Sequence, residues 1–238
     1  IPSEGIVILV PLHVDPGDVA FVSKALGWQP FWYMIRTTEM YGWRGWMGAR
    51  TGALAIDEES EKGRSSGFKA AVEAVARENG PRFTVVFAQG ELVQSEEIKR
   101  EGFKEGYFAL ARIASKKLKQ AVYVQPMIIH YRRDARSATM FHRILRAFGS
   151  KHFRNFFGYA NFGGIAIVGR PWLVDSSLPQ VDPMKISQIQ LSAGMKSLTE
   201  GTHLPKDSHV AVDLTVDRMK ILQRLALKLS GESKREQS

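Results

Sequence analysis

The chain contains no cysteine and no apolar run long enough to cross a bilayer. Without cysteine there are no disulfides and no thiolate metal sites, so the core must hold the fold, which is compatible with a reducing compartment. The short apolar runs exclude an ordinary membrane-spanning helix within these residues, and no signal peptide is visible. Because the chain starts at Ile1, directly before its first expected strand, an anchor further upstream is left open. We expect a cytoplasmic protein.

Acidic residues are fewer than basic ones, 24 against 33, which gives a formal net charge of +9. This excess indicates an anionic partner, which could be nucleic acid, a membrane surface or an acidic ligand. No nucleic-acid recognition motif is recognisable, so we expect no nucleic-acid partner. The six histidines show no metal-ligand spacing, and no metal is implied.

Short apolar runs alternate with helical patterns along the chain, which predicts an α/β fold with a mostly parallel central sheet and helices on both faces. We expect one domain over residues 1–230 and a disordered tail over 231–238. The expected strands are 6–10, 52–56, 83–87 and 121–129, and the expected helices are 19–26, 68–76, 107–118 and 213–229.

His13 and Asp18 stand at the turn between the first expected strand and the first expected helix. Pro16 and Gly17 bend the chain between them, so the Asp18 carboxylate could return to the imidazole. Such a pair can act as a general base, with the carboxylate fixing the ring tautomer. Gln89 follows another expected strand, and the carboxyl ends of parallel strands share one edge of a sheet, where ligands bind.

A second pattern, Gly63-Arg64-Ser65-Ser66-Gly67, matches the Gly-x-Ser-x-Gly sequence of a nucleophile elbow. An elbow requires the strand to run straight into the turn, whereas polar residues intervene here. We therefore expect Ser65 or Ser66 to be the N-cap of the next helix.

The order of motifs resembles the glycerolipid and lysophospholipid acyltransferases, the family related to 1-acylglycerol-3-phosphate acyltransferase. The resemblance covers about residues 5 to 172. The motifs that carry it are His13 with Asp18, Gly52 to Ile56, Phe87-Ala88-Gln89-Gly90-Glu91, Phe103-Lys104-Glu105-Gly106, Val124-Gln125-Pro126, and Gly164 to Pro171.

The resemblance implies an acyltransferase in which His13 deprotonates an acceptor hydroxyl and Asp18 orients the histidine. The hydroxyl would attack the thioester of acyl-CoA or acyl carrier protein, a co-substrate, and no cofactor is implied. The residues expected to bind substrate are Glu58, Arg64, Gln89, Gly90, Glu91, Phe103, Lys104 and Gly106.

The chain departs from the family pattern at the motifs that bind the acceptor. Where the family has arginine, glutamate and Thr-Arg, this sequence has Glu58, Gln89 and Glu91-Leu92. Glutamates would repel a phosphomonoester, so we expect a neutral, hydroxyl-rich or glycosylated lipid acceptor. Two alternatives remain: a lysophosphatidate or lysophospholipid acyltransferase with Arg64 as a replacement phosphate ligand, and a lipid-binding relic without catalysis.

Two aromatic segments carry further expectations. Residues 137–162 form an inserted, basic, phenylalanine-rich amphipathic pattern, which favours contact with a membrane surface over a helix packed on the sheet. Residues 27–52 contain several tryptophans and tyrosines, which indicate either core plus a loop or one wall of an apolar ligand tunnel. We therefore expect a peripheral membrane enzyme.

Overall fold

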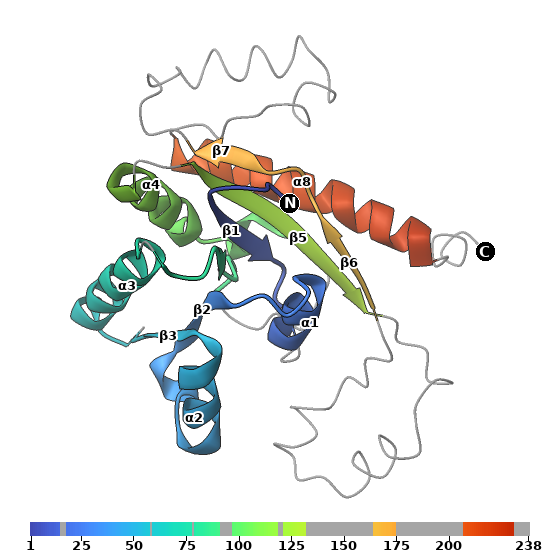
Figure 1. The fold of residues 1–238 in the computed structure, drawn as a ribbon. Coiled ribbons are helices and arrows are strands. Elements are labelled where there is room, and N and C mark those ends of the chain that lie inside the picture. Colours follow the sequence, from blue (N-terminus) through green and yellow to red (C-terminus); the bar gives the residue numbers. More distant parts are fainter. Residues whose placement is uncertain are drawn as a thin grey trace, which may run out of the picture.

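The computed structural model describes residues 1–14, 18–57, 59–77, 79–90, 97–118, 121–131, 164–174 and 207–230. These residues form a mostly parallel sheet with helices on both of its faces, which confirms the predicted α/β class (Figure 1). The expected inserted segment 137–162 and the expected tail 231–238 lie outside the described residues. No helix in the described ranges is long and apolar enough to span a membrane.

The sheet has seven strands, six of which follow the order β3-β2-β4-β1-β5-β6, and β7 also pairs with β5. All neighbours from β3 to β5 are parallel, whereas β6 and β7 run antiparallel to β5. The strands are β1 (Ile6–Pro11), β2 (Phe31–Arg36), β3 (Ala53–Ile56), β4 (Phe83–Val85), β5 (Val122–Tyr131), β6 (Gly164–Val168) and β7 (Trp172–Val174).

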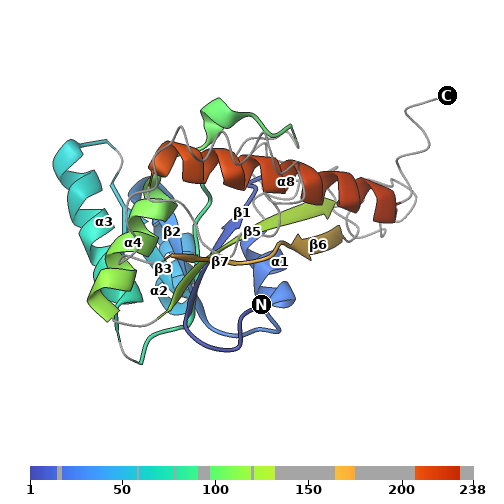
Figure 2. The same ribbon diagram turned by 90° about the horizontal axis from the view of Figure 1, so that it is seen from above.

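Strand β1 lies at the centre because every one of its residues is apolar and buried. Its side chains alternate between two hydrophobic clusters, one on each face of the sheet. Helices α3, α4 and α8 pack on the face that receives Ile8 and Val10, and α1 packs on the face that receives Val7 and Leu9 (Figure 2). The helices are α1 (Asp18–Ala25), α2 (Gly42–Thr51), α3 (Glu61–Val75), α4 (Gly106–Leu118) and α8 (Ser208–Ser230), with short 3-10 turns η1 (Thr37–Glu39) and η2 (Arg100–Gly102).

Helix α3 corrects one expectation. It begins at Glu61, and the hydroxyl of Ser60 caps it by accepting a hydrogen bond from the Gly63 amide at 2.9 Å. Ser65 and Ser66 therefore lie inside the helix, and the prediction that one of them is the N-cap was wrong. The Gly-x-Ser-x-Gly pattern is helical throughout, so it forms no strand-to-helix elbow.

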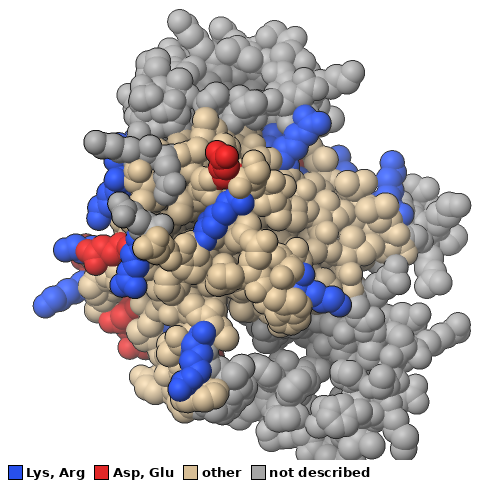
Figure 3. Space-filling view, in the orientation of Figure 1, with Lys and Arg blue, Asp and Glu red and all other residues tan. Residues whose placement is uncertain are grey.

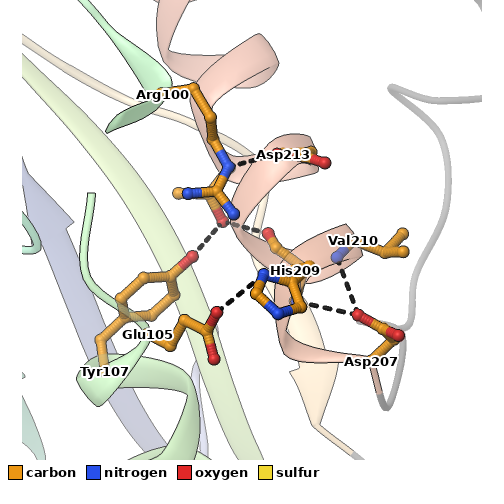
Figure 4. Close-up of polar contacts among 9 residues, drawn as sticks. Arg100, Glu105, Tyr107, Asp207, His209, Val210 and Asp213 are labelled. Atoms are coloured by element: carbon orange, nitrogen blue, oxygen red, sulfur yellow. Dashed lines mark hydrogen bonds and ion pairs between the residues drawn. The ribbon is translucent and has the colours of Figure 1, made fainter. Parts of the chain in front are cut away.

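Helix α8 is fastened to the rest of the domain at its first turns (Figure 4). Arg100 points toward Asp213, and the His209 ring lies 2.9 Å from a Glu105 carboxylate oxygen. Deeper in, the Tyr107 hydroxyl donates to Thr215 Oγ1 at 2.9 Å, and burial raises the pKa of Tyr107 well above its usual value. These contacts hold the first turns of α8 against η2 and the start of α4.

Candidate active site

The His13 and Asp18 side chains meet at the carboxyl end of β1. Asp18 is the first residue of α1, and its Oδ2 lies 3.0 Å from His13 Nδ1. The same oxygen accepts a 2.7 Å hydrogen bond from the Val14 amide. The proximity predicted from the spacing is therefore present, although residues 15–17 lie outside the described ranges.

The contact with the buried Asp18 carboxylate favours one tautomer of the histidine. Asp18 has no exposed surface, whereas 21% of the His13 side chain is exposed. A carboxylate can only accept, so Nδ1 carries the hydrogen and Nε2 keeps a lone pair for a proton. The ring also stacks on Phe87, with 4.1 Å between centroids and 27° between planes, which restricts its rotation.

Tyr131 contributes a third polar group, which sequence reasoning had not assigned to the site. It is the last residue of β5, it is buried, and its hydroxyl donates a short hydrogen bond to Asp18 Oδ1. Phe21 of α1 packs edge-on against its ring, with 5.3 Å between centroids. Both oxygens of the buried carboxylate thus have donors, as a charge without water contact requires.

Gln89 supports the backbone of the histidine. Its Oε1 accepts a 2.8 Å hydrogen bond from the His13 amide, and the residue is buried. A glutamate here could accept the same bond, so the family's glutamate and this glutamine can share this supporting function. The expectation that Gln89 binds acceptor hydroxyls stays a prediction.

Two cations approach Gly90, immediately after Gln89. Arg36, the last residue of β2, donates from Nη2 to the Gly90 carbonyl oxygen at 2.9 Å. The Lys104 side chain lies over the glycine so closely that a Cβ there would be 2.6 Å from Nζ, and Gly90 also has a φ of +69°. Any side chain at this position would therefore be strained and would displace the lysine. Sequence reasoning included Lys104 but missed Arg36.

The remaining predicted substrate residues are more scattered. Phe103 is buried in the core, and Gly106 is the first residue of α4. Arg64 is exposed on α3, the helix that follows β3. In the sheet, β2 and β4 lie between β3 and β1. Glu58 and Glu91 lie outside the described residues. Within the described ranges, no group of three or more His, Asp or Glu side chains is placed to hold a metal ion.

Comparison with known protein families gives a match. A family model described as Acyltransferase matches residues 1–130, which is more than half of the chain and includes all the site residues except Tyr131. No curated protein matches the chain.

Proposed function

The chain belongs to the acyltransferase family, and from this premise we propose that it moves a fatty acyl group from acyl-CoA or acyl carrier protein to a hydroxyl of a lipid acceptor. The match confirms the resemblance inferred from the motifs and supports a lipid acyltransferase. The single observation behind the proposed mechanism is the 3.0 Å contact between His13 Nδ1 and the buried Asp18 carboxylate.

In this mechanism His13 Nε2 takes the proton from the acceptor hydroxyl while its oxygen attacks the thioester carbonyl carbon. The tetrahedral intermediate collapses by breaking the carbon–sulfur bond, and the leaving thiolate receives the proton back from the imidazolium. Asp18 stabilises the imidazolium that exists between these steps. The products are an ester and a free thiol, so atoms and charge balance without a cofactor.

Replacement of the base is the direct test of this mechanism. We expect His13→Ala to lower kcat by about two to four orders of magnitude, because general base catalysis contributes that much. Asp18→Asn should also lower kcat, since the amide can leave the ring in the wrong tautomer. Release of free thiol from acyl-CoA in the presence of acceptor measures both. A His13→Ala protein that folds and keeps its turnover would reject His13 as the base.

For the acceptor, the sequence favours a neutral, hydroxyl-rich or glycosylated lipid. Glu58 and Glu91-Leu92 stand where the family has the arginines that bind the acceptor phosphate, and Gln89 stands where the family has a glutamate. Gln89 lies beside His13 in the structure, at the edge where an acceptor hydroxyl must reach Nε2. Hydroxyl groups could be bound by such uncharged or acidic side chains.

A specific observation favours the second candidate, a lysophosphatidate or other lysophospholipid. Arg36 and Lys104 both approach Gly90, which belongs to the motif Phe87 to Glu91. This motif therefore has cations nearby, although it lacks the arginine that the family has after the glycine. Guanidinium and ammonium groups are the side chains that bind phosphate best. In this proposal Arg36 and Lys104, rather than Arg64, would balance the acceptor charge.

The two acceptors can be separated with one pair of variants. If the acceptor carries a phosphate, Arg36→Gln and Lys104→Gln should each raise KM for lysophosphatidate roughly tenfold or more, because a charge-assisted hydrogen bond contributes about 1.5–3 kcal/mol. If the acceptor is neutral, the wild type should acylate a glycosylated lipid in preference to lysophosphatidate. Robust lysophosphatidate turnover that depends on Arg36 would remove the neutral-acceptor proposal.

We further propose that the enzyme works in the cytoplasm, peripherally on a membrane, because its acceptor and product are lipids and its net charge is +9. Contact through the phenylalanine-rich segment 137–162 stays a prediction.

A further inference from the structure

The last turns of α8 expose an apolar row that no other described element covers. Ile221, Leu225 and Leu229 are 37%, 43% and 60% exposed, although the helix buries Leu222 and Ala226 between them. Residues four apart lie on one side of a helix, so the three side chains form a continuous row. The first turns of α8 are different, because exposed Asp213 and Asp217 stand there.

A row of cations runs beside the apolar row. Lys220, Arg224 and Lys228 are exposed, and each directly precedes one of the three aliphatic residues. Figure 3 shows Lys and Arg side chains at the end of the molecule where α8 finishes in Figure 1. Adjacent apolar and basic rows on one helix match a bilayer interface, where the aliphatic side chains enter the headgroup boundary and the cations meet anionic lipids.

Contacts between α8 and residues paired with β5 show how the last turns of α8 lie relative to the sheet. Arg218 lies over the Trp172 ring at 3.7 Å, and Trp172 pairs with Val124 of β5. One helical turn later, Leu222 packs against Gly169, whose amide donates to the Pro126 carbonyl oxygen at 2.8 Å. Helix α8 therefore advances along β5 toward its carboxyl end.

That end of β5 is the active-site end. Tyr131 ends the strand and donates to Asp18, so the helix runs toward the catalytic edge. From Leu222 to Leu229 the helix rises about 10 Å, and from Pro126 to Tyr131 the strand rises about 17 Å. The turns with the two rows thus reach toward the level of His13, and Figures 1 and 2 both show them extending past β6.

We propose that Lys220 to Leu229 of α8 is a docking surface for anionic membrane lipids, which holds the catalytic edge of the sheet close to the bilayer. The proposal deepens the proposed function, because a lipid acceptor would be delivered from that bilayer. A second copy of the chain fits less well, since two such surfaces would bring their cationic rows together.

Vesicle co-sedimentation in the His13→Ala background tests the surface without turnover. The probes are vesicles of phosphatidylcholine alone and of phosphatidylcholine with phosphatidylglycerol. We expect binding that requires phosphatidylglycerol. Combined Lys220→Gln, Arg224→Gln and Lys228→Gln should weaken it about a hundredfold, since each cation near an anionic surface contributes about fivefold. Leu225→Gln with Leu229→Gln should weaken binding to the same vesicles.

Control variants change groups of the same kinds elsewhere on the surface. Lys62→Gln, Lys69→Gln and Lys116→Gln together delete three exposed cations, and Ile113→Gln changes an aliphatic residue that is 37% exposed on α4. These controls should retain at least half of the binding, and all variants should unfold at the wild-type temperature. Equal binding by the α8 variants and the controls would overturn the proposal, as would a wild-type dimer that the α8 variants abolish. The binding assay needs no turnover. Failure of the docking proposal can therefore be distinguished from failure of the proposed acyl transfer, which is measured separately with the wild type.

Discussion

Two side chains contact the His13 imidazole, and a third supports its backbone. Asp18 contacts Nδ1, Phe87 stacks on the ring, and Gln89 accepts from the backbone amide. Each contact limits a different movement: rotation about the ring axis, tilting, and displacement of the loop. A base whose Nε2 is fixed in direction loses less free energy in reaching a reactive geometry with the acceptor hydroxyl.

Tyr131 donates to Asp18, which in turn contacts His13, so we expect Tyr131 to act as a positioning residue. We expect Tyr131→Phe to lower kcat about tenfold with little change in KM, because the carboxylate loses one of its donors while the substrate site is untouched. In an Asp18→Ala background the same substitution should have no further effect, and a double-mutant cycle measures this coupling. Additive losses in the cycle would show that Tyr131 acts by another route.

At the scale of elements, uninterrupted short apolar runs made the central strands predictable, because β1, β4 and β5 are buried on both faces. The segment 27–52 was harder: the sequence indicated core with a loop or a tunnel wall, whereas the structure has β2 and α2 there. Helix α2 contains three glycines, which weaken any helical signal, and Gly52 caps its end with a left-handed φ of 88°. Exposed Trp28 and Trp46 also do not belong to the core.

Part of the candidate site could also be predicted from the sequence, and part could not. His13 and Asp18 are five residues apart, so local turn chemistry could predict their contact. Arg36 and Tyr131 reach the site only because the strands are ordered β2-β4-β1-β5. Parallel strands are joined by long crossovers, and their order leaves no local pattern in the sequence. The partners from those strands therefore required the structure.

The junction of α4 and α8 predicts a dependence of stability on alkaline pH. Burial raises the pKa of Tyr107 above its usual 10.0, so the unfolded chain ionises first. The stabilising contribution is complete below about pH 10 and is lost as pH rises toward the folded-state pKa, by up to about 1.4 kcal/mol per pH unit.

Urea unfolding of the wild type and Tyr107→Phe at pH 7, 9 and 10.5 measures this effect. The difference in free energy of unfolding between the two should be constant from pH 7 to 9 and should fall by pH 10.5. The comparison cancels the opposite contribution of Arg218, whose pKa burial lowers to about 10 and which favours folding as pH rises above that value. A constant difference at all three pH values would contradict the assignment to Tyr107.

The whole molecule combines the candidate active site with the proposed lipid-docking surface around one sheet. The carboxyl ends of β1, β2 and β4 supply or precede the site residues, and α8 extends toward the same end beside β5. The sheet thereby fixes the distance between the place where a thioester would be attacked and the place where lipid would be met. This arrangement suits an acyltransferase whose acceptor remains in a bilayer while its donor arrives from water.

Mass spectrometry of lipid products tests the central claim most directly. The protein is incubated with acyl-CoA carrying an isotopically labelled acyl chain and with total membrane lipid, in parallel with His13→Ala at equal concentration. We predict a new lipid ester that carries the label with the wild type and at least a hundredfold less of it with His13→Ala. A folded wild-type protein that yields no labelled ester, or equal amounts of labelled ester from both proteins, would contradict acyl transfer by His13.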